Sequence, residues 1–382
     1  MDDENPTVTS LEVLNRDCLL QIFALLRPQG GLRPLSLTCR WLRESCMEVL
    51  FERTFADVAL LQYCPPGGFP PPCLWPYLRC MTLLERFGPA HNERTKYLCP
   101  THEDNVASSL HAMRQLQKVI FQGEQQCLPW PIIYAVLSTP TLRSLELHGG
   151  LTIDREASHA AGNLQRAPLV SLCLVPEYLR PSPHHYASEI EGLASLLEHF
   201  PQSLQTLVLF SQSTPFTLLS RCDWPQLREL CIEGDGERVW TCPIPLVSVL
   251  SRMPRLRVLQ LKLALRYDQH PKPIWPQDHN IAVLPWPELE SLTVSWPCVD
   301  DGIFEHLPDT LRHLSLRCWP HLYTAHGYGR TSRRKPIPWL MDAPPCADVL
   351  GALGKCPKGS ALRSLSLEFA ADTDIADAGL LQ

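Results

Sequence analysis

The sequence predicts an α/β protein in which a small unit of three helices precedes an irregular solenoid. Three observations predict it: a six-residue phrase recurs along most of the chain, apolar stretches ending in proline precede many of the phrases, and the N-terminal segment has helical spacing. In the solenoid we expect a parallel sheet on the concave face and helices on the convex face. Such stacked units present a long binding surface instead of one catalytic pocket.

The N-terminal segment predicts three short helices. Asn15 can cap a first helix, in which apolar residues recur at intervals of three and four: Cys18, Leu19, Ile22, Phe23 and Leu26. After Gly30 and Gly31 a short second helix can follow, and a third continues to about Phe51. Three helices in about 45 residues make a very small core, so the unit needs a partner or the adjoining domain for stability.

Two parts of this segment carry a resemblance to a known family. Leu14-Asn-Arg-Asp-Cys-Leu-Leu-Gln-Ile-Phe-Ala-Leu-Leu26 and Leu35-Ser-Leu-Thr-Cys-Arg-Trp-Leu-Arg43 resemble an F-box of the variety common in fungal proteins, placed at residues 8–56. Two departures are Asn15, where proline is usual, and Pro34 in the second helix. The resemblance implies docking to a Skp-type adaptor, and through it to the cullin-RING scaffold of an SCF-type ubiquitin ligase.

The same resemblance implies the residues that touch the adaptor. They are Leu14, Ile22, Leu26, Leu35, Leu37 and Cys39, while Leu19 and Leu42 are expected in the small core. An apolar patch of this kind gains roughly 1.5 to 3 kcal/mol per fully buried large side chain when a partner covers it. Residues 57–76, which contain Pro65 to Pro72, are expected to be a linking region.

The repeated phrase is leucine-x-x-apolar-x-apolar. It opens at nine leucines, with a weaker tenth at Leu78: Leu116, Leu142, Leu169, Leu204, Leu227, Leu256, Leu289, Leu311 and Leu362. The intervals between the nine are 26, 27, 35, 23, 29, 33, 22 and 51 residues. The fourth and sixth positions alternate with polar neighbours, which predicts a half-buried strand in each phrase.

Helix-like apolar stretches precede several phrases and end in proline. They are 133–137 before Pro140, 193–200 before Pro201, 246–253 before Pro254 and 303–307 before Pro308. Because proline cannot continue a helix, each proline should end the helix and begin the turn into the strand.

This repeat pattern resembles a degenerate form of the leucine-rich repeat family, and the resemblance covers residues 77–370. Gly149, Gln212 and Gly234 stand where the family usually has asparagine or cysteine, and the long last interval predicts a loop insertion at about 319–345. An F-box followed by leucine-rich repeats implies a substrate-recognition subunit of a ubiquitin ligase. The alternative is a repeat scaffold outside the ubiquitin system, whose N-terminal helices cap the first repeat.

The third, fifth and seventh positions of each phrase should face the concave side of the sheet. We predict a substrate-binding face containing Phe210, Glu229, Glu233 and Lys262, suited to a protein with an apolar anchor and a basic flank. In the alternative with a helical cap, Leu14, Ile22 and Leu35 would pack on the first repeat, whereas an F-box leaves them exposed.

Composition limits the other classes. A formal net charge of -6 argues against a nucleic-acid partner, and the basic run Arg330 to Lys335 is expected in a solvated loop. The sixteen cysteines form no Cys-x-x-Cys pair and suit a reducing cytoplasm or nucleus. Without a catalytic or metal motif or an 18-residue apolar stretch, we expect neither an enzyme nor a membrane protein, and no cofactor or metal.

Overall fold

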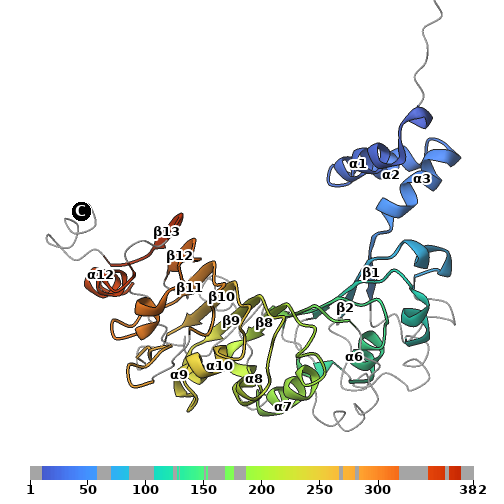
Figure 1. The fold of residues 1–382 in the computed structure, drawn as a ribbon. Coiled ribbons are helices and arrows are strands. Elements are labelled where there is room, and N and C mark those ends of the chain that lie inside the picture. Colours follow the sequence, from blue (N-terminus) through green and yellow to red (C-terminus); the bar gives the residue numbers. More distant parts are fainter. Residues whose placement is uncertain are drawn as a thin grey trace, which may run out of the picture.

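A computed structural model describes most of the chain. It covers residues 11–57, 70–85, 107–123, 127–128, 130–149, 152–153, 168–175, 186–265, 270–279, 284–317, 343–357 and 361–370. The helical unit at one end contains η1 (Leu11–Val13), α1 (Arg16–Leu26), α2 (Leu32–Ser36) and α3 (Arg40–Leu50) (Figure 1).

Local sequence explains these helices. The Asn15 side chain accepts a hydrogen bond from the Asp17 N–H at 3.0 Å and caps α1, as predicted. Gly30 has a φ of 71° in the turn that follows α1, a conformation that glycine adopts without strain. Pro34 falls in the first turn of α2, where its missing N–H would have no helical partner in any case.

The described strands form one long parallel sheet. In spatial order they are β1 (Arg53–Asp57), β2 (Cys80–Glu85), β3 (Lys118–Gly123), β5 (Ser144–Gly149), β7 (Ser171–Val175), β8 (Thr206–Phe210), β9 (Glu229–Asp235), β10 (Val258–Ala264), β11 (Ser291–Val294), β12 (His313–Leu316) and β13 (Ser364–Leu367). Strands β4 (Cys127–Leu128) and β6 (Thr152–Ile153) pair separately. The strand order follows the chain order, which is typical of a solenoid of repeated units.

Each of the nine phrases forms a strand that begins two residues after its first leucine, and the weaker tenth phrase at Leu78 forms β2. The first leucines are buried, with exposed fractions of 0 or 1%, except the half-buried Leu362. Together with the fourth and sixth positions they form one continuous core along the array, except at the last phrase, where Leu365 is exposed. The prediction of strands with an apolar stripe facing the core is confirmed, apart from β13.

Backbone hydrogen bonds fix the register at the start of each strand. The carbonyl of Arg228 accepts from the N–H groups of both Arg257 (2.8 Å) and Val258 (2.9 Å) on the next unit. The same double acceptance recurs from Glu52, before β1, to Arg312, before β12. Each unit therefore aligns the next one, whatever the length of chain between them.

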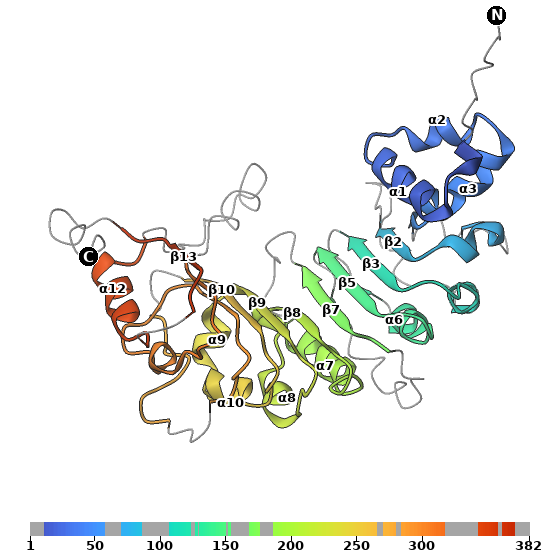
Figure 2. The ribbon, with the colours of Figure 1, turned by 45° about the horizontal axis from the view of Figure 1, so that its top comes forward.

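Helices lie on the outer side of the curved sheet (Figures 1 and 2). They include α6 (Trp130–Leu137), α7 (Tyr186–Leu197), α8 (Phe216–Arg221), α9 (Glu237–Thr241), α10 (Leu246–Leu250) and α12 (Cys346–Gly354), with short turns η2 (Pro72–Tyr77), η5 (Ser211–Ser213) and η6 (Gly302–His306). The stretch 133–137 before Pro140 is helical as predicted. The stretches before Pro201 and Pro254 are helical only to Leu197 and Leu250, and the stretch before Pro308 is a 3-10 turn that ends at His306. The sheet thus lines the inner face and the helices line the outer face.

Three described strands were not predicted, namely β1 and the short pair β4 and β6. Arg53–Asp57 forms β1 and pairs in parallel with β2, so the sheet begins inside the segment assigned to the helical unit. Residues 58–69 of the predicted linking region lie outside the described residues, as do most of the predicted insertion and the whole basic run at 330–335. No described helix is long and apolar enough to cross a membrane.

Candidate protein-interaction surfaces

The helical unit has a hydrophobic core of its own. Its buried members are Leu19, Phe23, Leu32, Leu42 and Cys46, and they form a cluster separate from the core of the repeats. The predicted core positions Leu19 and Leu42 are 6% and 9% exposed. The helical unit is therefore not simply the first layer of the repeat core.

Apolar side chains are unusually exposed on this unit. Of the seven large apolar side chains that are exposed in the described residues, five lie between residues 11 and 37: Leu11, Val13, Leu14, Leu25 and Leu37. Leu14 is 40% exposed and Leu37 is 67% exposed. Exposed apolar side chains gathered in so short a segment make this unit a candidate interaction surface.

The six predicted adaptor contacts divide into two groups. Leu14, Leu37 and Cys39 are exposed, whereas Ile22, Leu26 and Leu35 are half-buried and pack against the small core. The Cys39 sulfur also accepts from the Leu42 N–H and caps α3.

A cavity of about 510 Å³ opens between α1, α3 and η2. Its apolar lining includes Leu14, Leu20, Phe23, Trp41 and Tyr77. Polar side chains line the same opening, among them the ion pair between Arg16 and Glu48 at 2.9 Å. Leu14 thus stands beside a recess large enough to receive an apolar side chain.

The unit is joined to the sheet through the end of α3. The Glu52 carbonyl accepts from the N–H groups of Arg79 (3.0 Å) and Cys80 (2.9 Å), and the Glu48 carboxylate pairs with the Arg79 guanidinium at 2.7 Å. None of the predicted adaptor residues makes these hydrogen bonds or this ion pair.

The second candidate surface is the inner face of the sheet. Strand register places Thr206 beside Glu229, Val208 beside Cys231 and Phe210 beside Glu233. Glu233 is in turn beside Lys262, and Cys231 is beside Gln260. The predicted residues Glu229, Glu233 and Lys262 therefore lie on neighbouring strands of one face.

The acidic residues of this face differ in environment. Glu229 is exposed and accepts from the Thr206 hydroxyl at 3.4 Å. Glu233 is half-buried, and that burial raises the pKa of its carboxyl while the positive charge of Lys262 opposes the rise. Burial also raises the pKa of the Cys231 thiol to about 12, so this thiol stays protonated at neutral pH.

Phe210 corrects the sequence analysis, which placed it on the accessible face. Its side chain is only 1% exposed. Residues 211–214 turn immediately after β8, and the Phe210 ring lies so close to Gly234 that a Cβ there would meet ring carbon Cε2 at 2.8 Å. The aromatic ring is buried against Gly234 of β9 and offers no apolar anchor to a partner.

A charged cluster further along the same face was not selected from the sequence. The Glu146 carboxylate pairs with Lys118 Nζ at 2.6 Å and with His148 Nε2 at 3.0 Å. Burial on its own would raise the pKa of Glu146, but these two contacts lower it overall. The sequence carried a signal for this cluster, because Lys118 and Glu146 occupy concave-face positions of neighbouring phrases.

Within the described side chains, the cysteines are free thiols. No group of three or more His, Cys, Asp or Glu that could hold a metal ion occurs in this part of the chain. Four histidines that could be considered as metal ligands lie outside the described residues: His184, His185, His321 and His326.

Comparison with known proteins gives little support for any one family. No family model matches the sequence, and no curated protein matches it. Among solved structures, the chain is similar to a chain of the Rad7 and Elc1 complex in yeast, with 12% sequence identity, a TM-score of 0.31, and coverage of 64% of this chain and 76% of that chain. At that TM-score the likeness supports neither a function nor a partner.

Proposed function

We propose that the chain is a non-catalytic substrate-recognition subunit of an SCF-type ubiquitin ligase. The helical unit acts as an F-box that docks onto a Skp-type adaptor in the cytoplasm or nucleus, and the repeats bind a protein substrate. Holding the substrate near a ubiquitin-loaded enzyme would speed transfer through proximity.

The observation that carries this proposal is the exposed apolar surface on a helical unit with its own core. A repeat cap would bury Leu14, Ile22 and Leu35 against the first unit, but Leu14 is exposed, and Ile22 and Leu35 pack against the small core of the helical unit. The junction uses the end of α3 instead, which leaves Leu14 and Leu37 exposed. Covering the exposed parts of these two leucines would contribute roughly 2 to 3 kcal/mol to adaptor binding.

On the repeat side, the inner face offers a mixed surface. Glu229 and Glu233 supply negative charge, Lys262 supplies positive charge, and Val208 lies half-buried on the neighbouring strand β8, beside Cys231. A protein segment with basic side chains suits this face better than a polyanion does.

The test is co-expression of the full chain with a Skp-type adaptor, followed by pull-down and gel filtration. The informative variant combines Leu14→Asp with Leu37→Asp, because both side chains are exposed and their replacement leaves the small core intact. Ile22 is a poorer choice, since it packs against that core. The matched control is Leu365→Asp, which changes a 47% exposed leucine on β13 at the far end of the sheet.

We expect a stoichiometric complex with the unchanged chain and with the Leu365 variant, and loss of the complex in the double variant. Absence of a complex from a folded, unchanged chain would favour the repeat scaffold with a helical cap. A complex that survives the double variant would remove Leu14 and Leu37 from the interface.

A further inference from the structure

A row of arginines follows the edge of the sheet at which the strands begin. Each is the residue immediately before a strand, and each is exposed: Arg79, Arg143, Arg228, Arg257, Arg312 and Arg363. Direct backbone hydrogen bonds join neighbours in the row, from the Arg257 N–H to the Arg228 carbonyl (2.8 Å) and from the Arg363 N–H to the Arg312 carbonyl (2.7 Å). The repeat therefore places these side chains at equivalent positions along one edge.

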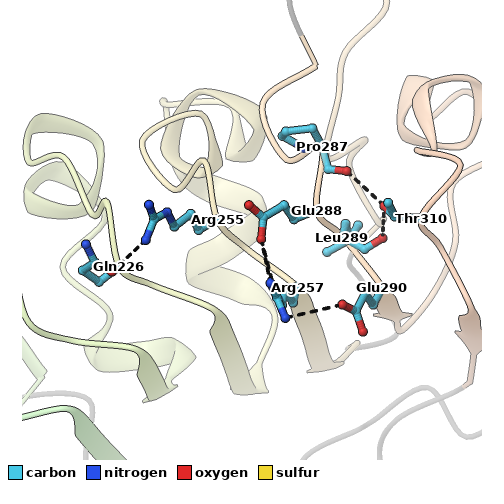
Figure 3. Close-up of polar contacts among 8 residues, drawn as sticks. All are labelled: Gln226, Arg255, Arg257, Pro287, Glu288, Leu289, Glu290 and Thr310. Carbon is cyan, nitrogen blue, oxygen red and sulfur yellow. Dashed lines mark hydrogen bonds and ion pairs between the residues drawn. The ribbon is translucent and has the colours of Figure 1, made fainter.

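The charge of this edge is not a consequence of composition, since the whole chain carries a net charge of -6. Arg257 is compensated by Glu288 at 3.1 Å and Glu290 at 3.7 Å, as Figure 3 shows, and Arg79 is compensated by Glu48.

The other four arginines have no ion-pair partner among the residues that the structure describes: Arg143, Arg228, Arg312 and Arg363. We call these four the arginine edge. Uncompensated positive charge remains on both sides of the neutralised Arg257.

The turns beneath this edge are held in place by contacts between consecutive units. Arg255 donates to the Gln226 side-chain oxygen at 3.1 Å, and the Thr310 hydroxyl donates to the carbonyls of Pro287 (3.0 Å) and Leu289 (2.8 Å) (Figure 3). A partner would thus meet a row of guanidinium groups on an ordered scaffold, which reduces the entropy lost on binding.

We propose that the arginine edge binds an acidic polypeptide segment in extended conformation. Arg228 and Arg363 precede strands that are four positions apart in the sheet, a separation of roughly 19 Å, which an extended segment of about six residues spans. Arginine pairs with carboxylates through two parallel hydrogen bonds, so a segment with alternating acidic residues fits the row. This surface is distinct from the adaptor surface and does not depend on it.

Nucleic acid suits the same edge less well. Glu288 and Glu290 stand in the middle of the row, and Glu229 follows Arg228 directly. A uniform polyanion would meet these carboxylates, whereas a polypeptide can place neutral residues opposite them.

The experiment measures binding of a fluorescein-labelled ten-residue peptide of alternating glutamate and serine to the full chain by fluorescence anisotropy. The edge variant combines Arg228→Glu with Arg312→Glu, and the control variant combines Arg221→Glu with Lys272→Glu, two exposed basic residues that do not directly precede a strand. Both variants change the net charge equally. Circular dichroism melts report folding, and Arg228→Gln with Arg312→Gln replaces the edge variant if charge reversal prevents folding.

We expect the unchanged chain and the control variant to bind alike, and the edge variant to bind about tenfold more weakly at low salt. The matching peptide with glutamine in place of glutamate should bind more weakly than the acidic peptide. Equal weakening in both variants, or no preference for glutamate over glutamine, would overturn the proposal. Tighter binding of a single-stranded oligonucleotide of equal charge would also overturn it, in favour of a nucleic-acid surface.

Discussion

Replacing Gly234 with alanine should destabilise the middle of the repeat array without altering its charge. Gly234 lies near the end of β9 with a φ of 133°, a backbone conformation that residues other than glycine rarely adopt. A Cβ at this position would approach the Ser211 hydroxyl oxygen to 2.6 Å and the Phe210 ring to 2.8 Å. Ser211 cannot move away freely, because its hydroxyl donates to the Asp235 carbonyl at 2.6 Å.

The magnitude follows from two costs and one gain. A residue held in such a backbone conformation costs roughly 1 to 3 kcal/mol. Overpacking of a buried site costs about 1 to 3 kcal/mol more. The lower entropy of an unfolded chain with alanine offsets roughly 0.4 to 1 kcal/mol. The expected net loss in the free energy of unfolding is therefore about 2 to 5 kcal/mol.

Urea unfolding measures the total effect, and amide hydrogen exchange shows where it falls. Because repeat arrays open locally, exchange should accelerate in β8 and β9 more than in β2 and β3. Gly354→Ala is the matched control, since no atom lies within 4 Å of that site at the end of α12. The control should be neutral or slightly stabilising. An alanine at Gly234 that unfolds at the same urea concentration as the unchanged chain would refute the reasoning.

Three further outcomes are expected. Asp301→Asn should lower the free energy of unfolding by about 2 kcal/mol in thermal melts, because the buried carboxylate accepts from three backbone N–H groups and an amide cannot accept all three; an unchanged melt would contradict this. Glu146→Gln should cost about 1 kcal/mol at neutral pH. Since the folded pKa of this carboxyl is lowered, the cost should shrink as the pH falls below its ordinary value of 4.5, and a constant difference between pH 7 and pH 3 would show that the pair contributes nothing. At pH 7.5 a maleimide should label the exposed Cys18 quickly and leave Cys231 unlabelled, and equal labelling in the folded chain would contradict the raised thiol pKa.

The strands were predictable because the sequence signal and the packing have the same cause. Every leucine that opens a phrase must enter the shared core, so Leu116, Leu204 and Leu256 appear both as a pattern and as fully buried side chains. The cap of α1 was predictable for a similar reason, since Asn15 acts within one turn of its own helix. Both signals are local.

The errors arose where neighbours distant in the sequence decide the outcome. β1 lacks the phrase, because its core-facing positions Thr54 and Ala56 are small, and it is a strand because β2 pairs with it. Phe210 occupies an inward-facing position by spacing, but the turn after β8 and the close approach of Gly234 enclose it. Spacing along one strand specifies a face of the sheet and does not specify which loops cover it.

Irregular spacing and regular register coexist because different atoms control them. The intervals between phrases range from 22 to 51 residues, so side chains outside the phrases cannot set the alignment. Alignment comes from the buried leucines and from the carbonyl before each strand, which accepts from two N–H groups of the next unit. Any residue can supply that carbonyl, so the alignment does not depend on which side chain the residue carries. Arginine recurs there without a folding requirement for its charge, and a binding role for the arginine edge would account for it.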